Sequence, residues 1–138
     1  MAGKTSGIGW TTFTLADSGG TPRDVRNDLT GLQFGTPRGV WDVTGIDKSG
    51  MERRLLLADF STTMNGAFNP DANKSHDVLK TVPSTSVARA MALGHGGVTL
   101  SVNILITDYS FNRAQSGELP WTAPGVLADG AVPTWAAV

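Results

Sequence analysis

The chain has 138 residues, 11 basic and 12 acidic side chains, and no cysteine. This length fits one domain with a buried core, and the near balance of charge argues against a large basic patch that binds nucleic acid. The absence of cysteine excludes disulfides, thiolate metal sites and cysteine nucleophiles. Because no apolar run approaches the ~20 residues that span a bilayer and residues 1–10 lack the apolar core of a signal peptide, we expect no membrane partner.

Seventeen glycines and seven prolines separate short alternating runs, a pattern typical of strands and turns. Residues 1–9 are expected to form a flexible N-terminal segment. Residues 10–16 (WTTFTLA) and 29–34 (LTGLQF) predict the first two strands. The second strand should end at Gly35-Thr36-Pro37, because proline cannot donate a hydrogen bond to a neighbouring strand.

Residues 36–54 (TPRGVWDVTGIDKSGMERR) show no sustained period and exceed the ~12–15 residues usual for a structureless loop. A disordered linker would contain fewer apolar residues than this segment does: Val40, Trp41, Val43, Ile46 and Met51. One interpretation is a loop folded over the core of its own chain. The favoured interpretation is an arm that packs on another chain, because Trp and Met are typical interface anchors.

Residues 55–69 predict a long strand that alternates strictly from Asp59 onward. The run from Asp59 to Phe68 would span ~33 Å at ~3.3 Å per residue, far longer than the usual ~5–6 residues. One face is apolar and is predicted to be core: Phe60, Met64 and Phe68. The other face is small and polar or acidic, without lysine or arginine: Asp59, Ser61, Thr63 and Asn65.

The rest of the chain predicts one short helix and three more strands. Residues 74–80 (KSHDVLK) form the helix, capped by Asn73 or Ser75 and ended before Pro83. Strands are expected at 86–93, 98–109 and 118–123, with a GHGG turn at 94–97. Residues 98–109 provide further core residues: Leu100, Val102 and Ile104. The whole pattern indicates a single mainly β domain, a sandwich or partial barrel with one short helix.

No group of residues predicts chemistry. The two histidines, His76 and His95, stand in no metal-ligand spacing, and no serine has a G-x-S-x-G setting. We therefore predict no catalytic, metal or cofactor site and no enzyme activity. The distinctive features are structural: a long amphipathic strand, an apolar arm and many sheet edges that must be covered or paired.

Three segments together resemble the major tail tube protein of long-tailed bacteriophages: residues 27–49, 52–83 and 124–136 (NDLTGLQFGTPRGVWDVTGIDKS, ERRLLLADFSTTMNGAFNPDANKSHDVLKTVP and PGVLADGAVPTWA). The resemblance implies a small β-sandwich with a short helix, six copies of which form a ring. The inner sheets join neighbours into one continuous barrel, rings stack into a tube, and a long loop and the N-terminal segment reach the next ring. DNA passes through the lumen without specific binding. Related tubes occur in contractile injection systems and gene transfer agents.

The resemblance also implies partners and a location. The partners would be further copies of the chain, a tape measure protein, a tail terminator and distal tail proteins, in a virion tail assembled in the host cytoplasm. Asp59, Ser61, Thr63 and Asn65 would line the lumen, because a cationic wall would bind the DNA phosphates. A second candidate lining is Ser101, Asn103 and Thr107.

Two other interpretations stay open at this point. One is a single-ring tail completion or baseplate protein of similar fold. The other is a carbohydrate-binding β-sandwich whose stacking platforms would be the four tryptophans: Trp10, Trp41, Trp121 and Trp135.

Overall fold

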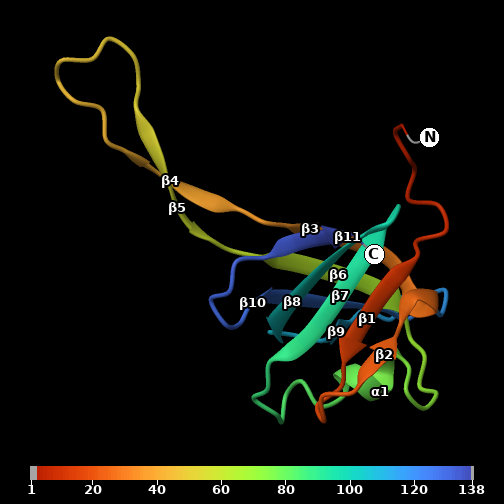
Figure 1. The fold of residues 1–138 in the computed structure, drawn as a ribbon. Coiled ribbons are helices and arrows are strands. Elements are labelled where there is room, and N and C mark those ends of the chain that lie inside the picture. The colour runs from red at the N-terminus through yellow and green to blue at the C-terminus, as the bar shows by residue number, and fades with distance from the viewer. Residues whose placement is uncertain (1–2, 138) are drawn as a thin grey trace.

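A computed structural model describes residues 3–137, so the first two residues of the expected N-terminal segment lie outside the described part. The mainly β fold with one short α-helix is confirmed (Figure 1). Two helical elements are present, the 3-10 turn η1 (Arg26–Asp28) and α1 (Ser75–Leu79). The strands are β1 (Thr12–Ala16), β2 (Pro22–Asp24), β3 (Leu29–Gly35), β4 (Arg38–Asp42), β5 (Arg53–Ala58), β6 (Ser61–Ala67), β7 (Arg89–His95), β8 (Val98–Ile106), β9 (Ser110–Phe111), β10 (Pro120–Leu127) and β11 (Thr134–Ala137).

Nine strands form one antiparallel sheet in the order β2-β1-β7-β8-β10-β6-β3, with β11 paired to β8 and β9 paired to β10. Two strands share one edge of β8: β11 pairs with residues 98–101, and β10 pairs with residues 104–106. The sheet folds over at this point, so that β1, β7 and β8 face β6 and β10 across one core. The sheet does not close into a barrel, and β2 and β3 are its two ends.

Apolar side chains from both halves of the sheet meet in the core. Of the predicted core residues, Phe60, Met64, Leu100 and Ile104 are fully buried and Val102 is 8% exposed. The sequence pattern did not single out the other large members of the core: Phe13, Leu15, Val78, Leu79, Met91, Leu93 and Trp121.

Phe68 lies outside the core, contrary to prediction, and is 37% exposed. Strand β6 ends at Ala67, and beyond a strand end alternation no longer fixes which face a side chain joins. The Phe68 ring lies instead beside His76 and Phe111, with ring centroids 5.0 and 5.8 Å away.

The long strand expected at 55–69 is two strands. Residues 53–58 pair with β4 as β5, and β6 begins at Ser61. Asp59 and Phe60 form the break between them. The N–H of Asp59 donates to the carbonyl oxygen of Pro37 at 3.0 Å, and its carboxylate accepts the N–H of Phe60 at 2.8 Å.

Buried polar groups attach α1 to one end of the sandwich. The Asp28 carboxylate accepts the N–H of Ser75 at 3.0 Å and the side-chain amide of Asn69 at 2.8 Å. At the other end of α1, the Arg89 guanidinium, only 2% exposed, donates to the carbonyl oxygen of Val78 at 2.7 Å. The predicted caps are therefore wrong: the N-cap is Lys74 without a side-chain bond, and Asp28 caps the helix from 47 positions earlier.

An aromatic group closes this same end of the sandwich. The only tyrosine of the chain, Tyr109, lies against Phe111 and Trp121 with ring centroids 4.6 and 5.8 Å away. Its hydroxyl lies 3.1 Å from Nδ1 of His76. Burial and, to a lesser extent, the nearby Asp28 carboxylate raise the pKa of Tyr109 to about 12.

Replacing Gly66 with alanine should destabilise the fold. A Cβ at this position would overlap the carbonyl oxygen of Asp28 and come within 2.5 Å of the Trp121 ring. Overpacking of this kind costs about 1–3 kcal/mol, which urea unfolding followed by tryptophan fluorescence would measure. Gly35→Ala in β3 is the matched control, because a Cβ there meets no atom within 4 Å. Equal stability of the two variants would contradict the packing described here.

The raised pKa of Tyr109 should make the folded chain sensitive to alkaline pH. The unfolded chain ionises this hydroxyl near its ordinary pKa of ~10, so the stability contributed by the neutral hydroxyl is intact below that pH. It is lost as the pH rises toward about 12. Tyrosinate absorbance of the native chain should titrate near the higher value, and Tyr109→Phe should lose less stability over this range. Native titration near the ordinary value would contradict the partly buried environment of this side chain.

Candidate functional site

The segment predicted to be an arm, residues 36–54, lies in a two-stranded ribbon that projects from the sandwich (Figure 1). Within the described residues, strands β4 and β5 pair only with each other, in a register that places Arg38 opposite Ala58 and Asp42 opposite Arg53. Beyond the strands, the N–H of Val43 donates to the carbonyl oxygen of Glu52 at 3.0 Å. We call residues 38–58 the arm.

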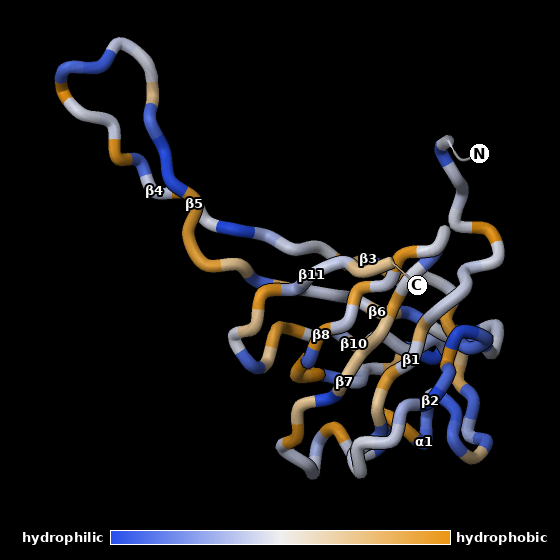
Figure 2. The backbone as a smooth tube through the Cα atoms, viewed as in Figure 1, coloured by the Kyte–Doolittle hydropathy of each residue, from blue (hydrophilic) through white to orange (hydrophobic). Residues whose placement is uncertain are grey.

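The arm carries large apolar side chains that face water. Figure 2 shows hydrophobic segments along the arm, well outside the sandwich. Trp41 is 59% exposed and Leu57 90% exposed, and Ile46 at the tip is completely exposed. Exposed apolar surface of this extent marks an interaction site. The exposed apolar residues of the arm are Val40, Trp41, Ile46, Met51, Leu55, Leu56 and Leu57, whereas Val43 is half-buried.

The arm does not fold over its own core, since the buried core of the described residues includes none of residues 38–58. An isolated two-stranded ribbon is at best marginally stable in water. Side chains at the base of the tip help to hold it: the Thr44 hydroxyl donates to the Asp42 carboxylate at 2.6 Å and accepts the N–H of Glu52 at 2.8 Å. The Thr44 hydroxyl and the Thr44 N–H both donate to the Asp42 carboxylate and hold its pKa below its usual range.

An uncharged polar face lies beside the base of the arm. It is the outer face of β3, β6 and β10, and its residues come from three cross-strand rows: Gly31, Asn65 and Thr122; Gln33, Thr63 and Pro124; Gly35, Ser61 and Val126. Ser61 is exposed, and Thr63 and Asn65 are half-buried. The Thr122 hydroxyl donates to the Asn65 side-chain oxygen at 2.8 Å. Three of the four predicted lining residues therefore share this face.

Asp59, the fourth predicted lining residue, is not on the uncharged face. It lies in the break before β6, at the base of the arm. Its carboxylate is already bound by the N–H of Phe60. The sequence placed it on the same face because the alternation runs through the break without interruption.

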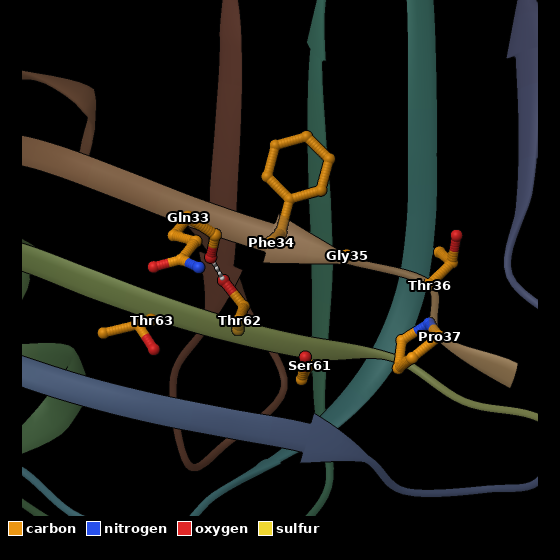
Figure 3. Close-up of a pocket in the computed structure, with 8 residues that line it drawn as sticks. All are labelled: Gln33, Phe34, Gly35, Thr36, Pro37, Ser61, Thr62 and Thr63. Atoms are coloured by element: carbon orange, nitrogen blue, oxygen red, sulfur yellow. Dashed lines mark hydrogen bonds between the residues drawn. The ribbon is translucent and has the colours of Figure 1, made fainter. Parts of the chain in front are cut away.

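A shallow hollow of about 360 Å³ lies on the uncharged face (Figure 3). It is lined by residues 33–37 and 61–63, and the Thr62 hydroxyl donates to the carbonyl oxygen of Gln33 at 2.9 Å across it. The lining contains hydroxyl, amide and apolar groups, without a charged side chain or a nucleophile paired with a base. Such a surface suits sliding contact or packing and supplies no catalytic constellation.

The second candidate lining lies on a different part of the sheet. Ser101 and Asn103 are on the outer face of β8, opposite Ala92 and Ala90 of β7. The Asn103 amide donates to the Asp129 carboxylate at 2.7 Å, which lowers the pKa of Asp129. Thr107 lies past the end of β8 and is exposed. This face therefore includes a carboxylate that the face of Ser61 lacks.

The four tryptophans do not form one binding platform. Trp121 is buried and Trp41 is on the arm. Trp10 stacks on His95 at 5.2 Å and lies edge-on to Phe34, and Trp135 contacts Phe34 from β11. The single stacking platform of four tryptophans that the carbohydrate-binding interpretation predicts is therefore not formed.

Within residues 3–137, His, Asp and Glu side chains form no cluster of three that could hold a metal ion. No helix in this part of the chain has the length and apolar character needed to cross a membrane.

Comparisons with known proteins find no matching family model and no matching curated protein. Solved structures of low sequence identity share the fold. A chain in the tail of an empty gene transfer agent particle, refined with C6 symmetry, superposes with a TM-score of 0.73 at 16% identity, over 97% of this chain and 100% of that chain. A chain in the virion of a native gene transfer agent particle superposes with a TM-score of 0.68 at 14% identity, over 91% and 95%. This chain thus has, over nearly its whole length, the fold of a protein found in a phage-like tail.

Proposed function

We propose that the chain is a structural, non-enzymatic subunit of a tail tube, which self-assembles into stacked hexameric rings around a channel for DNA. The observation that carries the proposal is the arm: a hydrogen-bonded ribbon with exposed Trp41, Ile46 and Met51 and no cover from its own chain. A similar chain occurs in a tail with C6 symmetry, which supports a six-membered ring. A projecting arm favours a stack over a single-ring completion or baseplate protein, because in a stack every ring meets a further copy that the same arm can contact.

The free sheet edges support the joining of neighbours within a ring. β3 pairs only with β6, and its sequence LTGLQFG lacks the lysine and proline that usually protect an edge. A groove of about 340 Å³ runs beside β3, lined in part by Gly7, Trp10 and Arg26. At the other side of this part of the sheet, β9 pairs only with β10. Strands from neighbouring copies added at these edges would remove them and continue the sheet into a barrel.

The uncharged face of Ser61, Thr63 and Asn65 is the proposed lumen lining. Duplex DNA carries one negative charge per ~1.7 Å, and cationic side chains gain affinity by releasing its counterions. A wall of hydroxyl, amide and glycine groups offers DNA no cationic binding site. Asp59, at the base of the arm, would add a carboxylate to the rim of each ring. The tape measure, terminator and distal tail proteins, the virion tail location and assembly in the host cytoplasm belong to the same proposal.

Trp41→Ala should stop tube growth while leaving the subunit folded, because the side chain contributes to assembly and not to the core. Electron microscopy and sedimentation across concentration would detect the loss of tubes, and an unchanged urea midpoint would show an intact fold. Trp41→Phe, which keeps an aromatic anchor, should retain assembly. Normal tubes from Trp41→Ala would refute the role of the arm.

Ser61→Lys should leave tubes of normal dimensions but reduce DNA delivery by particles built from the variant. The reason is that six lysines per ring would bind phosphate groups, so added salt should weaken binding of duplex DNA to the variant tubes. Ser101→Lys, on the outer face of β8, is the matched control and should deliver DNA normally. If Ser101→Lys reduced delivery and Ser61→Lys did not, the second candidate lining would replace the first.

A further inference from the structure

An exposed aromatic hollow lies at the end of the sandwich that α1 closes. It measures about 350 Å³ and is lined by His76, Lys80, Val82, Pro83, Thr107, Asp108, Tyr109 and Phe111. Phe111 is 43% exposed on its wall, and Phe68 beside it is 37% exposed. Exposed, adjacent aromatic rings of this kind are typical of protein contact surfaces.

The arm and the aromatic hollow lie at opposite ends of the same strands. The arm leaves the sandwich where β3 ends at Gly35 and β6 begins at Ser61. At the other end of β6, Phe68 adjoins Phe111 and His76. Figure 1 shows this separation, with the arm at one end of β6 and α1 toward the other end of the sandwich.

We propose that the aromatic hollow receives the arm of a second copy of this chain in the next ring. This inference rests on the proposed stacking of rings. In a head-to-tail stack all copies point the same way, so the contact between rings is heterologous: one end of a subunit meets the opposite end of the next. An arm that projects from one end must therefore meet the end where the aromatic hollow lies.

The chemistry of the two surfaces is complementary. The arm supplies Trp41, Ile46 and Met51, and both indole and thioether groups pack favourably on aromatic rings. The tip carries Asp47 and Lys48, which lie 3.7 Å apart, and the rim of the hollow carries Asp108 and Lys80, whose ammonium group is paired with Asp77 at 2.7 Å. When the arm docks, Lys48 would face Asp108 and Asp47 would join the Lys80–Asp77 pair around an apolar centre, which would orient the arm.

A second apolar groove is the main rival. It measures about 620 Å³ and is lined by Arg38, residues 55–58 and Val132. Because this groove lies at the base of the arm, at the same end of the sandwich, an arm reaching up from the preceding ring would arrive at the wrong end. We expect the body of the next subunit to cover this groove.

Lysine crosslinking of the unmodified chain tests the contact, because the chain has only four lysines: Lys48 is on the arm, Lys74 and Lys80 flank α1, and Lys4 precedes β1. Tubes would be assembled from mixed isotopically light and heavy chains, treated with a short amine-reactive crosslinker, and analysed by mass spectrometry. The expected product is a Lys48–Lys80 link that joins a light chain to a heavy one. Links from Lys48 to Lys4 without any to Lys80 would overturn the inference.

Engineered cysteine pairs sharpen the test, because the chain has no cysteine of its own. Tubes of Ile46→Cys with Lys80→Cys should give a ladder of covalent oligomers on mild oxidation. In tubes of the matched pair, Ile46→Cys with Val132→Cys, oxidation should form no disulfide between chains. The reverse result would assign the arm to the rival groove. If the paired variants do not assemble, the lysine links in the unmodified chain still decide. Tubes without the Lys48–Lys80 link would refute only this contact, whereas absence of rings and tubes in electron micrographs would refute the proposed function with it.

Discussion

A two-stranded ribbon cannot bury its own apolar side chains, and this constraint shapes the whole molecule. Burial needs a second layer, and the arm has none within its chain. The arm exposes large apolar side chains: Trp41, Ile46, Met51 and Leu55–Leu57. Such exposure favours aggregation of an isolated subunit, and a two-stranded ribbon by itself has only marginal stability. The arrangement is favourable only if another surface completes the layer. The arm therefore leaves the folded chain with an uncovered apolar layer, which a neighbouring copy would cover in the proposed stack.

The end of the sandwich opposite the arm is held together by buried polar groups. Helix α1 has five residues, too few to be stable by itself. Asp28 supplies its first hydrogen bond and Arg89 binds its last turn, both from elsewhere in the chain. Leaving either group buried without its partners would be costly, so each holds the helix, the 3-10 turn and the sheet in one arrangement. Such fixed geometry is what a repeated contact between identical subunits requires.

The sequence predicted the fold class, the helix and the faces of β6 and β8, because each depends on local periodicity. It missed what depends on pairing. The alternation from Asp59 to Phe68 continues through the break at residues 59–60 and past the end of β6. It therefore places Asp59 in the row of β6 and Phe68 in the core, whereas both residues lie outside β6 and Phe68 is partly exposed. The residue types at positions 59 and 68 continue the alternating pattern of their neighbours. The break becomes visible only from the strands that pair on either side of it. The arm was recognised from its apolar content, but its ribbon structure and the aromatic hollow depend on long-range contacts that no local pattern encodes.

Strand β6 links the separate properties of this fold in seven residues. One face supplies Met64 to the core, and the other supplies Ser61, Thr63 and Asn65 to the uncharged surface. One end continues into the arm, and the other leads to Phe68 and the aromatic hollow. Because these positions share a rigid, doubly paired strand, a displacement at either end must move the polar face as well. In a stack of rings, contacts made through the arm would therefore align the proposed lumen wall from ring to ring, without any residue that serves alignment alone.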